Sequence, residues 1–205
     1  MRFILPMLAF LTMATAVQAA DLTVVVKTPQ GRPVVDAVVT AYPNGPYDKS
    51  RIRFTWPAKV TQRNMTFEPF VLIVPVGAEV SFPNLDTVRH HVYSFSPAKT
   101  FELKLYGQDE TRSVRFDKAG VVALGCNIHD QMSAFVVVVD TPFAAKTDAS
   151  GQAVLRGMPG DQARIDVWHP YARAKGNLVS QSVALGATRH AVILDLRAPR
   201  RRGAY

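Results

Sequence analysis

The only cysteine of the chain, Cys126, lies in the run GCNIHDQM over residues 125–132. His129 and Met132 follow it at successive intervals of three residues, so a thiolate, an imidazole and a thioether share one short segment. Thiolate and thioether sulfur are soft ligands, and imidazole suits copper, so this combination favours a copper site. A lone cysteine cannot close an internal disulfide, so this thiol needs another explanation.

A second segment supplies further imidazoles. The run VSFPNLDTVRHHV covers residues 80–92 and ends in the pair His90 and His91. Two histidines and one cysteine in a trigonal plane, with a weak axial methionine, form the ligand set of a blue-copper electron-transfer site. A single cysteine argues against an iron–sulfur cluster, a thiolate-bridged copper pair and a multi-cysteine zinc site. Asp86, in the same segment, is interpreted as a turn or solvated residue.

The elements that must position these residues are predicted to be strands. The apolar runs are short and rich in β-branched residues, and turn residues such as PQG, PNG and DKAG separate them. Short strands with regular turn signals predict an all-β sandwich or barrel. The main runs are 22–26, 34–42, 70–76, 121–124, 135–139 and 191–196.

The outer parts of the chain share one pattern. Residues 24–39 read as strand, glycine turn and strand, and residues 147–160 contain TDASGQAVLRGMPG. Together they resemble the two halves of a carboxypeptidase-regulatory-like, prealbumin-like β-sandwich. The resemblance implies a split domain, 20–48 plus 141–197, into which residues 59–140 are inserted. Insertion is tolerated where the ends of a host domain lie close together at its surface.

Residues 59–140 resemble a cupredoxin domain. The family pattern of a V-x-F-x-N strand, an Asn-x5-His spacing and a Cys-x2-His-x2-Met loop is matched by Asn84, His90, Cys126, His129 and Met132. The resemblance implies a Greek-key β-sandwich with one type 1 copper ion held by His90, Cys126, His129 and Met132. The x2 loop resembles that of amicyanin. The whole chain resembles periplasmic proteins labelled methylamine utilization proteins.

The choice between the paired histidines stays open at this point, with His90 favoured. Successive strand residues face opposite sides, so both cannot easily enter one site. The spacing from Asn84 and the following Val92 favour His90, whereas His91, Tyr93 and Phe95 form a stripe on the other face.

Three further residues are predicted to contact the candidate ligands and fix their orientation: His91, Asn127 and Asn84. In cupredoxins, Asn usually follows the first ligand His, and Ser or Thr follows the Cys; these two side chains bridge the ligand loops. Here His91 and Asn127 occupy those positions, and we hypothesise that they form an equivalent bridge. Such contacts fix the orientation of metal ligands.

The N-terminal segment predicts export. Residues 1–19 begin with Met1 and Arg2, continue through an apolar stretch and end in VQA, as in a secretory signal peptide. No stretch is long enough to predict a membrane span. Residues 198–205 carry an arginine cluster and read as a basic C-terminal tail, and the net charge of +8 is moderate.

The sequence therefore predicts a periplasmic type 1 copper protein that carries single electrons and is not an enzyme. The expected partner is a c-type cytochrome or a periplasmic dehydrogenase, and no nucleic acid. Two alternatives remain: a copper-delivery protein without electron transfer, and an interaction or carbohydrate-binding-like module. Soft ligands also suit a copper(I) carrier.

Overall fold

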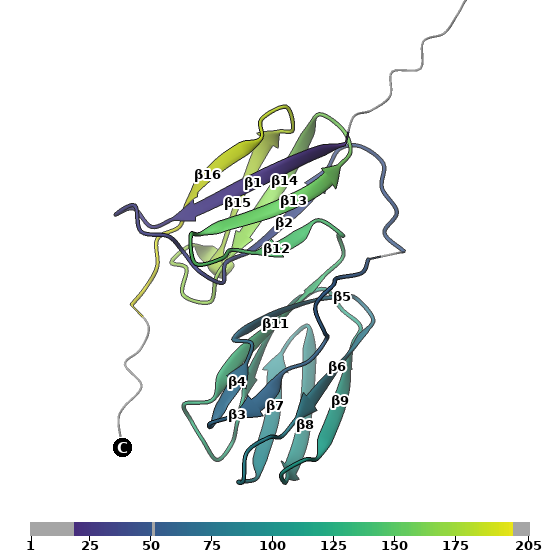
Figure 1. The fold of residues 1–205 in the computed structure, drawn as a ribbon, viewed down its shortest axis with the longest axis vertical. Coiled ribbons are helices and arrows are strands. Elements are labelled where there is room, and N and C mark those ends of the chain that lie inside the picture. The colour runs from purple at the N-terminus through teal and green to yellow at the C-terminus, as the bar shows by residue number, and fades with distance from the viewer. Residues whose placement is uncertain (1–18, 51, 199–205) are drawn as a thin grey trace, which may run out of the picture.

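The computed structural model describes residues 19–50 and 52–198, and its regular structure is built from strands (Figure 1). The predicted all-β class is confirmed; the one other regular element in the described part is a single 3-10 turn, η1 (Lys175–Asn177). The predicted signal peptide lies outside the described residues except for Ala19, as does the predicted tail except for Ala198. Within the described ranges, no helix has the length and apolar character needed to span a membrane.

One pair of sheets joins strands from the two ends of the described chain. The strand order is β13-β1-β16 in one sheet and β12-β2-β14-β15 in the other. Their facing sides share a single apolar core that includes Val24, Val39, Leu155 and Ile165, all at most 2% exposed. The bounds are β1 (Ala20–Lys27), β2 (Val38–Pro43), β12 (Ala144–Lys146), β13 (Gln152–Met158), β14 (Gln162–Trp168), β15 (Leu178–Ala184) and β16 (Arg189–Ile193).

The strands between these segments form a second sandwich, drawn below the first in Figure 1. One sheet has the order β5-β11-β10-β7-β8, and it packs on the pairs β6–β9 and β3–β4 around a separate core. The bounds are β3 (Thr61–Arg63), β4 (Thr66–Glu68), β5 (Val71–Pro75), β6 (Ala78–Pro83), β7 (His90–Ser96), β8 (Lys99–Tyr106), β9 (Thr111–Phe116), β10 (Gly120–Gly125) and β11 (Ser133–Val139).

The two sandwiches meet through strand β11, which is apolar on both faces. Val136 and Val138 point into the core of the second sandwich, while Val137 and Val139 belong to a cluster shared with Trp168 of the first. Burial on both faces explains why residues 135–139 read as FVVVV rather than as an alternating pattern. The sheet that carries the chemistry-bearing residues is thereby fixed to the other half of the molecule.

Candidate metal centre

Antiparallel pairing gathers the candidate ligands at one end of the five-stranded sheet. Strand β10 pairs with both β7 and β11 in antiparallel register, so the end of β10 lies beside the starts of its two neighbours. His90 is the first residue of β7, Cys126 directly follows β10, and Met132 directly precedes β11. Candidate ligands that are 36 residues apart in the chain therefore meet, as the pair Cys126 and His90 shows.

Three donor atoms converge at this end. His90 Nδ1 lies 3.2 Å from His129 Nδ1, and Cys126 Sγ lies 3.9 Å from His90 Nδ1 and 3.7 Å from His129 Nδ1. These three residues form the one group of potential metal ligands found among the described residues. His90 and Cys126 are buried, and His129 is partly exposed.

The spacing of the donors fits a three-coordinate transition metal. Bonds of about 2.0–2.1 Å to imidazole nitrogen and about 2.3 Å to thiolate, as known for zinc, put two nitrogens roughly 3.1–3.6 Å apart and nitrogen and sulfur roughly 3.6–3.9 Å apart. The observed separations of 3.2, 3.7 and 3.9 Å lie within these ranges. Two imidazoles with one thiolate match the equatorial donor set preferred by blue copper.

The loop between Cys126 and Met132 is closed by its own backbone. The amide of Met132 donates to the carbonyl of His129 at 2.9 Å, which makes a tight turn. Met132 is 2% exposed and belongs to the same apolar cluster as Cys126. The thioether is thus buried in the core that also holds the thiol.

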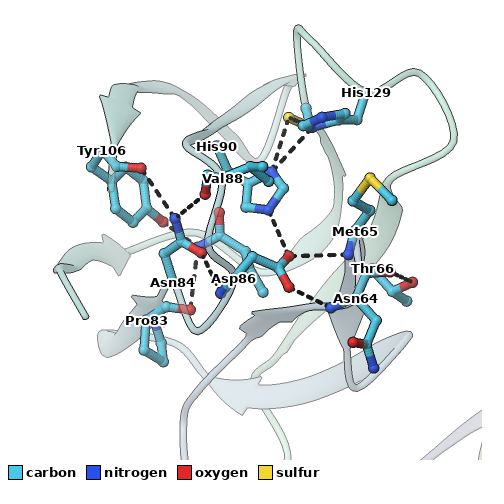
Figure 2. Close-up of polar contacts among 12 residues, drawn as sticks. Asn64, Met65, Thr66, Pro83, Asn84, Asp86, Val88, His90, Tyr106 and His129 are labelled. Atoms are coloured by element: carbon cyan, nitrogen blue, oxygen red, sulfur yellow. Dashed lines mark hydrogen bonds and ion pairs between the residues drawn. The ribbon is translucent and has the colours of Figure 1, made fainter. Parts of the chain in front are cut away.

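Asp86 contacts His90 directly, although the sequence suggested only a turn or solvated residue. Its Oδ2 lies 2.7 Å from His90 Nε2, and Figure 2 shows the carboxylate between His90 and the turn at Asn64 and Met65. Burial raises the pKa of Asp86, but hydrogen bonds from His90 and from the two turn amides outweigh burial and lower the pKa below its usual value. The signal that could have identified Asp86 is its position four residues before His90, yet the local pattern does not distinguish such a residue from an ordinary turn aspartate.

Asn84 organises the loop that carries Asp86. Its buried amide donates to the carbonyls of Val88 at 2.9 Å and Tyr106 at 3.1 Å, and its Oδ1 accepts the amide of Asp86 at 2.9 Å (Figure 2). Asn84 therefore acts on the site through the backbone of residues 84–88 and has no hydrogen bond to a candidate ligand.

The hypothesised bridge between His91 and Asn127 is wrong for the structure described. His91 Nε2 lies 2.8 Å from Glu102 Oε1, and the ring packs on Tyr93, so the side chain is directed to the outer face of the sheet. The reason is the pleat of β7, because His90 and Val92 point into the core and the residue between them must point away. No hydrogen bond joins His91 to Asn127 in the described part of the chain.

No protein-family model matches the chain, and neither does any curated protein. Among solved structures, it is similar to the copper-containing nitrite reductase of Thermus scotoductus SA-01, with 27% identity and a TM-score of 0.39 over 41% of this chain and 22% of that chain. It is also similar to a purple cupredoxin from Nitrosopumilus maritimus, with 22% identity and a TM-score of 0.37 over 40% of this chain and 98% of that chain. A reduced mutant of amicyanin gives 22% identity and a TM-score of 0.38 over 49% of this chain and 98% of that chain. This chain spans about a fifth of the nitrite reductase, and each of these likenesses covers less than half of this chain.

Proposed function

We propose that this protein binds one copper ion through His90, Cys126 and His129, with Met132 as a fourth donor, and carries single electrons between redox partners. The observation that carries the proposal is the convergence of two Nδ1 atoms and one Sγ atom within 4.8 Å of one another. This donor set is the one that blue-copper sites use, and copper bound there would supply a one-electron redox couple.

The surroundings of the donors favour electron transfer over catalysis. His90 is fully buried, and Cys126 and Met132 are at most 3% exposed. Strands β7 and β10, which pair with each other, carry His90 and Cys126 at neighbouring ends. These two donors therefore have little freedom to move when the charge of the copper ion changes. With Met132 as a fourth donor, the chain itself would supply all the ligands of the metal.

His129 is the route by which electrons would leave and enter. It is partly exposed, while the other imidazole is buried, and its neighbour Ile128 is 50% exposed. A partly exposed redox-active edge suits the weak, short-lived contacts of redox proteins. We expect the partner to be a c-type cytochrome or a periplasmic dehydrogenase, because residues 1–19 have the pattern of a secretory signal.

The test is to load the purified full chain with copper and to record the optical spectrum, the electron paramagnetic resonance spectrum and a voltammogram. We expect an intense visible band from the thiolate and a reversible one-electron wave. Cys126→Ser and His90→Gln should both abolish the band. His91→Gln is the matched control, since His91 lies next to His90 but pairs with Glu102, and it should leave the band unchanged.

Other outcomes separate the competing functions. Copper that binds without a visible band or a reversible wave, and that exchanges readily with a chelator, refutes the electron carrier and supports copper delivery. A wild-type chain that binds no copper refutes both and leaves an interaction module.

A further inference from the structure

We propose that the turn between β3 and β4 sets the orientation of His90 through Asp86, which makes Asn64, Met65 and Asp86 positioning residues for the donor set. The inference rests on the proposed function in one respect, that the donor set binds copper. The relevant contacts are all drawn in Figure 2.

The relay consists of three hydrogen bonds on one carboxylate. The amide of Asn64 donates to Asp86 Oδ1 at 2.5 Å, and the amide of Met65 donates to Asp86 Oδ2 at 3.0 Å. The same Oδ2 lies 2.7 Å from His90 Nε2. The Asp86 side chain is only 10% exposed, so these protein groups take the place of water around it.

The relay selects the tautomer of His90. An ionised carboxylate only accepts hydrogen bonds, so the proton of the neutral imidazole must sit on Nε2. The lone pair then sits on Nδ1, the atom directed at Cys126 Sγ and His129 Nδ1. A carboxylate behind a metal-bound histidine fixes the ring and its tautomer in this way.

The conformation of the turn points to the same role. Asn64 and Met65 both have φ of +52°, the left-handed pair that a two-residue hairpin turn requires. Successive backbone amides in such a turn can form a concave site for an anion, here the carboxylate of Asp86. Asn tolerates the left-handed region, whereas Met adopts it at a cost, so the strain at Met65 coincides with an amide that holds the carboxylate.

The hairpin is also tied to the loop that carries Asp86. The amide of Leu85 donates to the carbonyl of Gln62 at 2.9 Å, next to the isolated bridge between Gln62 and Asn84. A shift of the turn therefore moves the carboxylate together with its loop. The displaced Asp86 carboxylate then moves the His90 ring, although the turn lies some 25 residues before His90 in the chain.

The decisive measurement uses the metal-free full chain. Long-range ¹H–¹⁵N correlation spectra read the tautomer of each histidine, and the spectrum of His90→Gln assigns the signals of His90. We expect wild type to hold the proton on Nε2, and Asp86→Asn to give a mixture of tautomers. A wild-type His90 with its proton on Nδ1, or an Asp86→Asn protein with unchanged His90 signals, overturns the proposal.

Copper binding supplies the second measurement. Asp86→Asn should lower copper affinity about 10–100-fold and shift the reduction potential. Met65→Gly keeps the donating amide and suits the left-handed conformation, so a loss of copper affinity as large as that of Asp86→Asn would count against the amide as the part of Met65 that acts. Equal affinity in wild type and Asp86→Asn refutes the relay.

The two proposals fail in different ways. A wild type that binds no copper refutes the proposed function but leaves the tautomer measurement valid. A wild type that shows the visible band, together with an Asp86→Asn variant whose copper affinity and His90 signals equal those of wild type, refutes the relay alone. Circular dichroism of each variant confirms the fold.

Discussion

The contact between the two sandwiches predicts a measurable coupling between Phe135 and Trp168. Their rings meet edge to face, with centroids 5.4 Å apart and an interplanar angle of 64°, and Trp168 is 6% exposed. Truncation of a buried Trp costs about 3–5 kcal/mol, so we expect Trp168→Ala to fall in that range. Phe135 is half-buried, so Phe135→Ala should cost about 2–3 kcal/mol. The double variant should cost less than the sum by about 0.5–1.5 kcal/mol, the worth of an edge-to-face pair.

The assay is urea unfolding of the wild type, both single variants and the double variant, followed by circular dichroism because the substitution removes a tryptophan. Phe95→Ala is the matched control, since Phe95 lies in the same five-stranded sheet but is 80% exposed. It should cost less than about 0.5 kcal/mol. A coupling below about 0.3 kcal/mol, or a cost for Phe135→Ala no larger than that of the control, would refute the packing of the two sandwiches through these rings.

Two further predictions concern the first sandwich. Gly31→Ala should lower the free energy of unfolding by about 1 kcal/mol, because φ is +79° and the added methyl has open space around it. Gly151→Ala should lower it by roughly 2–3 kcal/mol, because φ is +75° and the methyl would lie 2.5 Å from the carbonyl oxygen of Val26. Equal melting temperatures for the two variants would count against the clash. Burial lowers the pKa of His169 below its ordinary 6.5, with Asp36 opposing this only in part, so the folded state favours the neutral ring. The stability present above pH 6.5 is lost as the pH falls through the lowered pKa, and His169→Gln should flatten that acid slope in thermal unfolding; an unchanged slope would show that His169 does not contribute.

The strand content could be predicted because burial leaves a local trace in the sequence. Short β-branched runs between turn residues predict strands, and the all-β class is confirmed. The run at residues 135–139 was predicted as a strand, but its sequence does not say what lies on each face. Val136 points into one core and Val137 into another. This depends on which parts of the chain pack against each face of β11, and those parts are far from it in the sequence.

The paired histidines show the same division between local and long-range information. Alternation along a strand establishes that only one of His90 and His91 can face a given site, and the inward side is that of His90. The partner of His91 could not be read from the sequence, because Glu102, whose register partner is Tyr93, comes within reach of His91 only through the pairing of β7 with β8. The hypothesised contact with Asn127 failed for that reason.

The sequence by itself determined the chemistry available to this protein. One thiol, two candidate first histidines, His129 and Met132 stand at spacings that suit copper, and those residue types are fixed before any folding. The tertiary structure decided which donors meet, because the ends of β7, β10 and β11 come together only when the strands pair. It also brought in Asp86 and the turn at Asn64 and Met65, which local sequence could not connect to His90. Hydrogen bonds reach only about 3 Å, so a relay of this kind exists only once the fold has brought its members into contact.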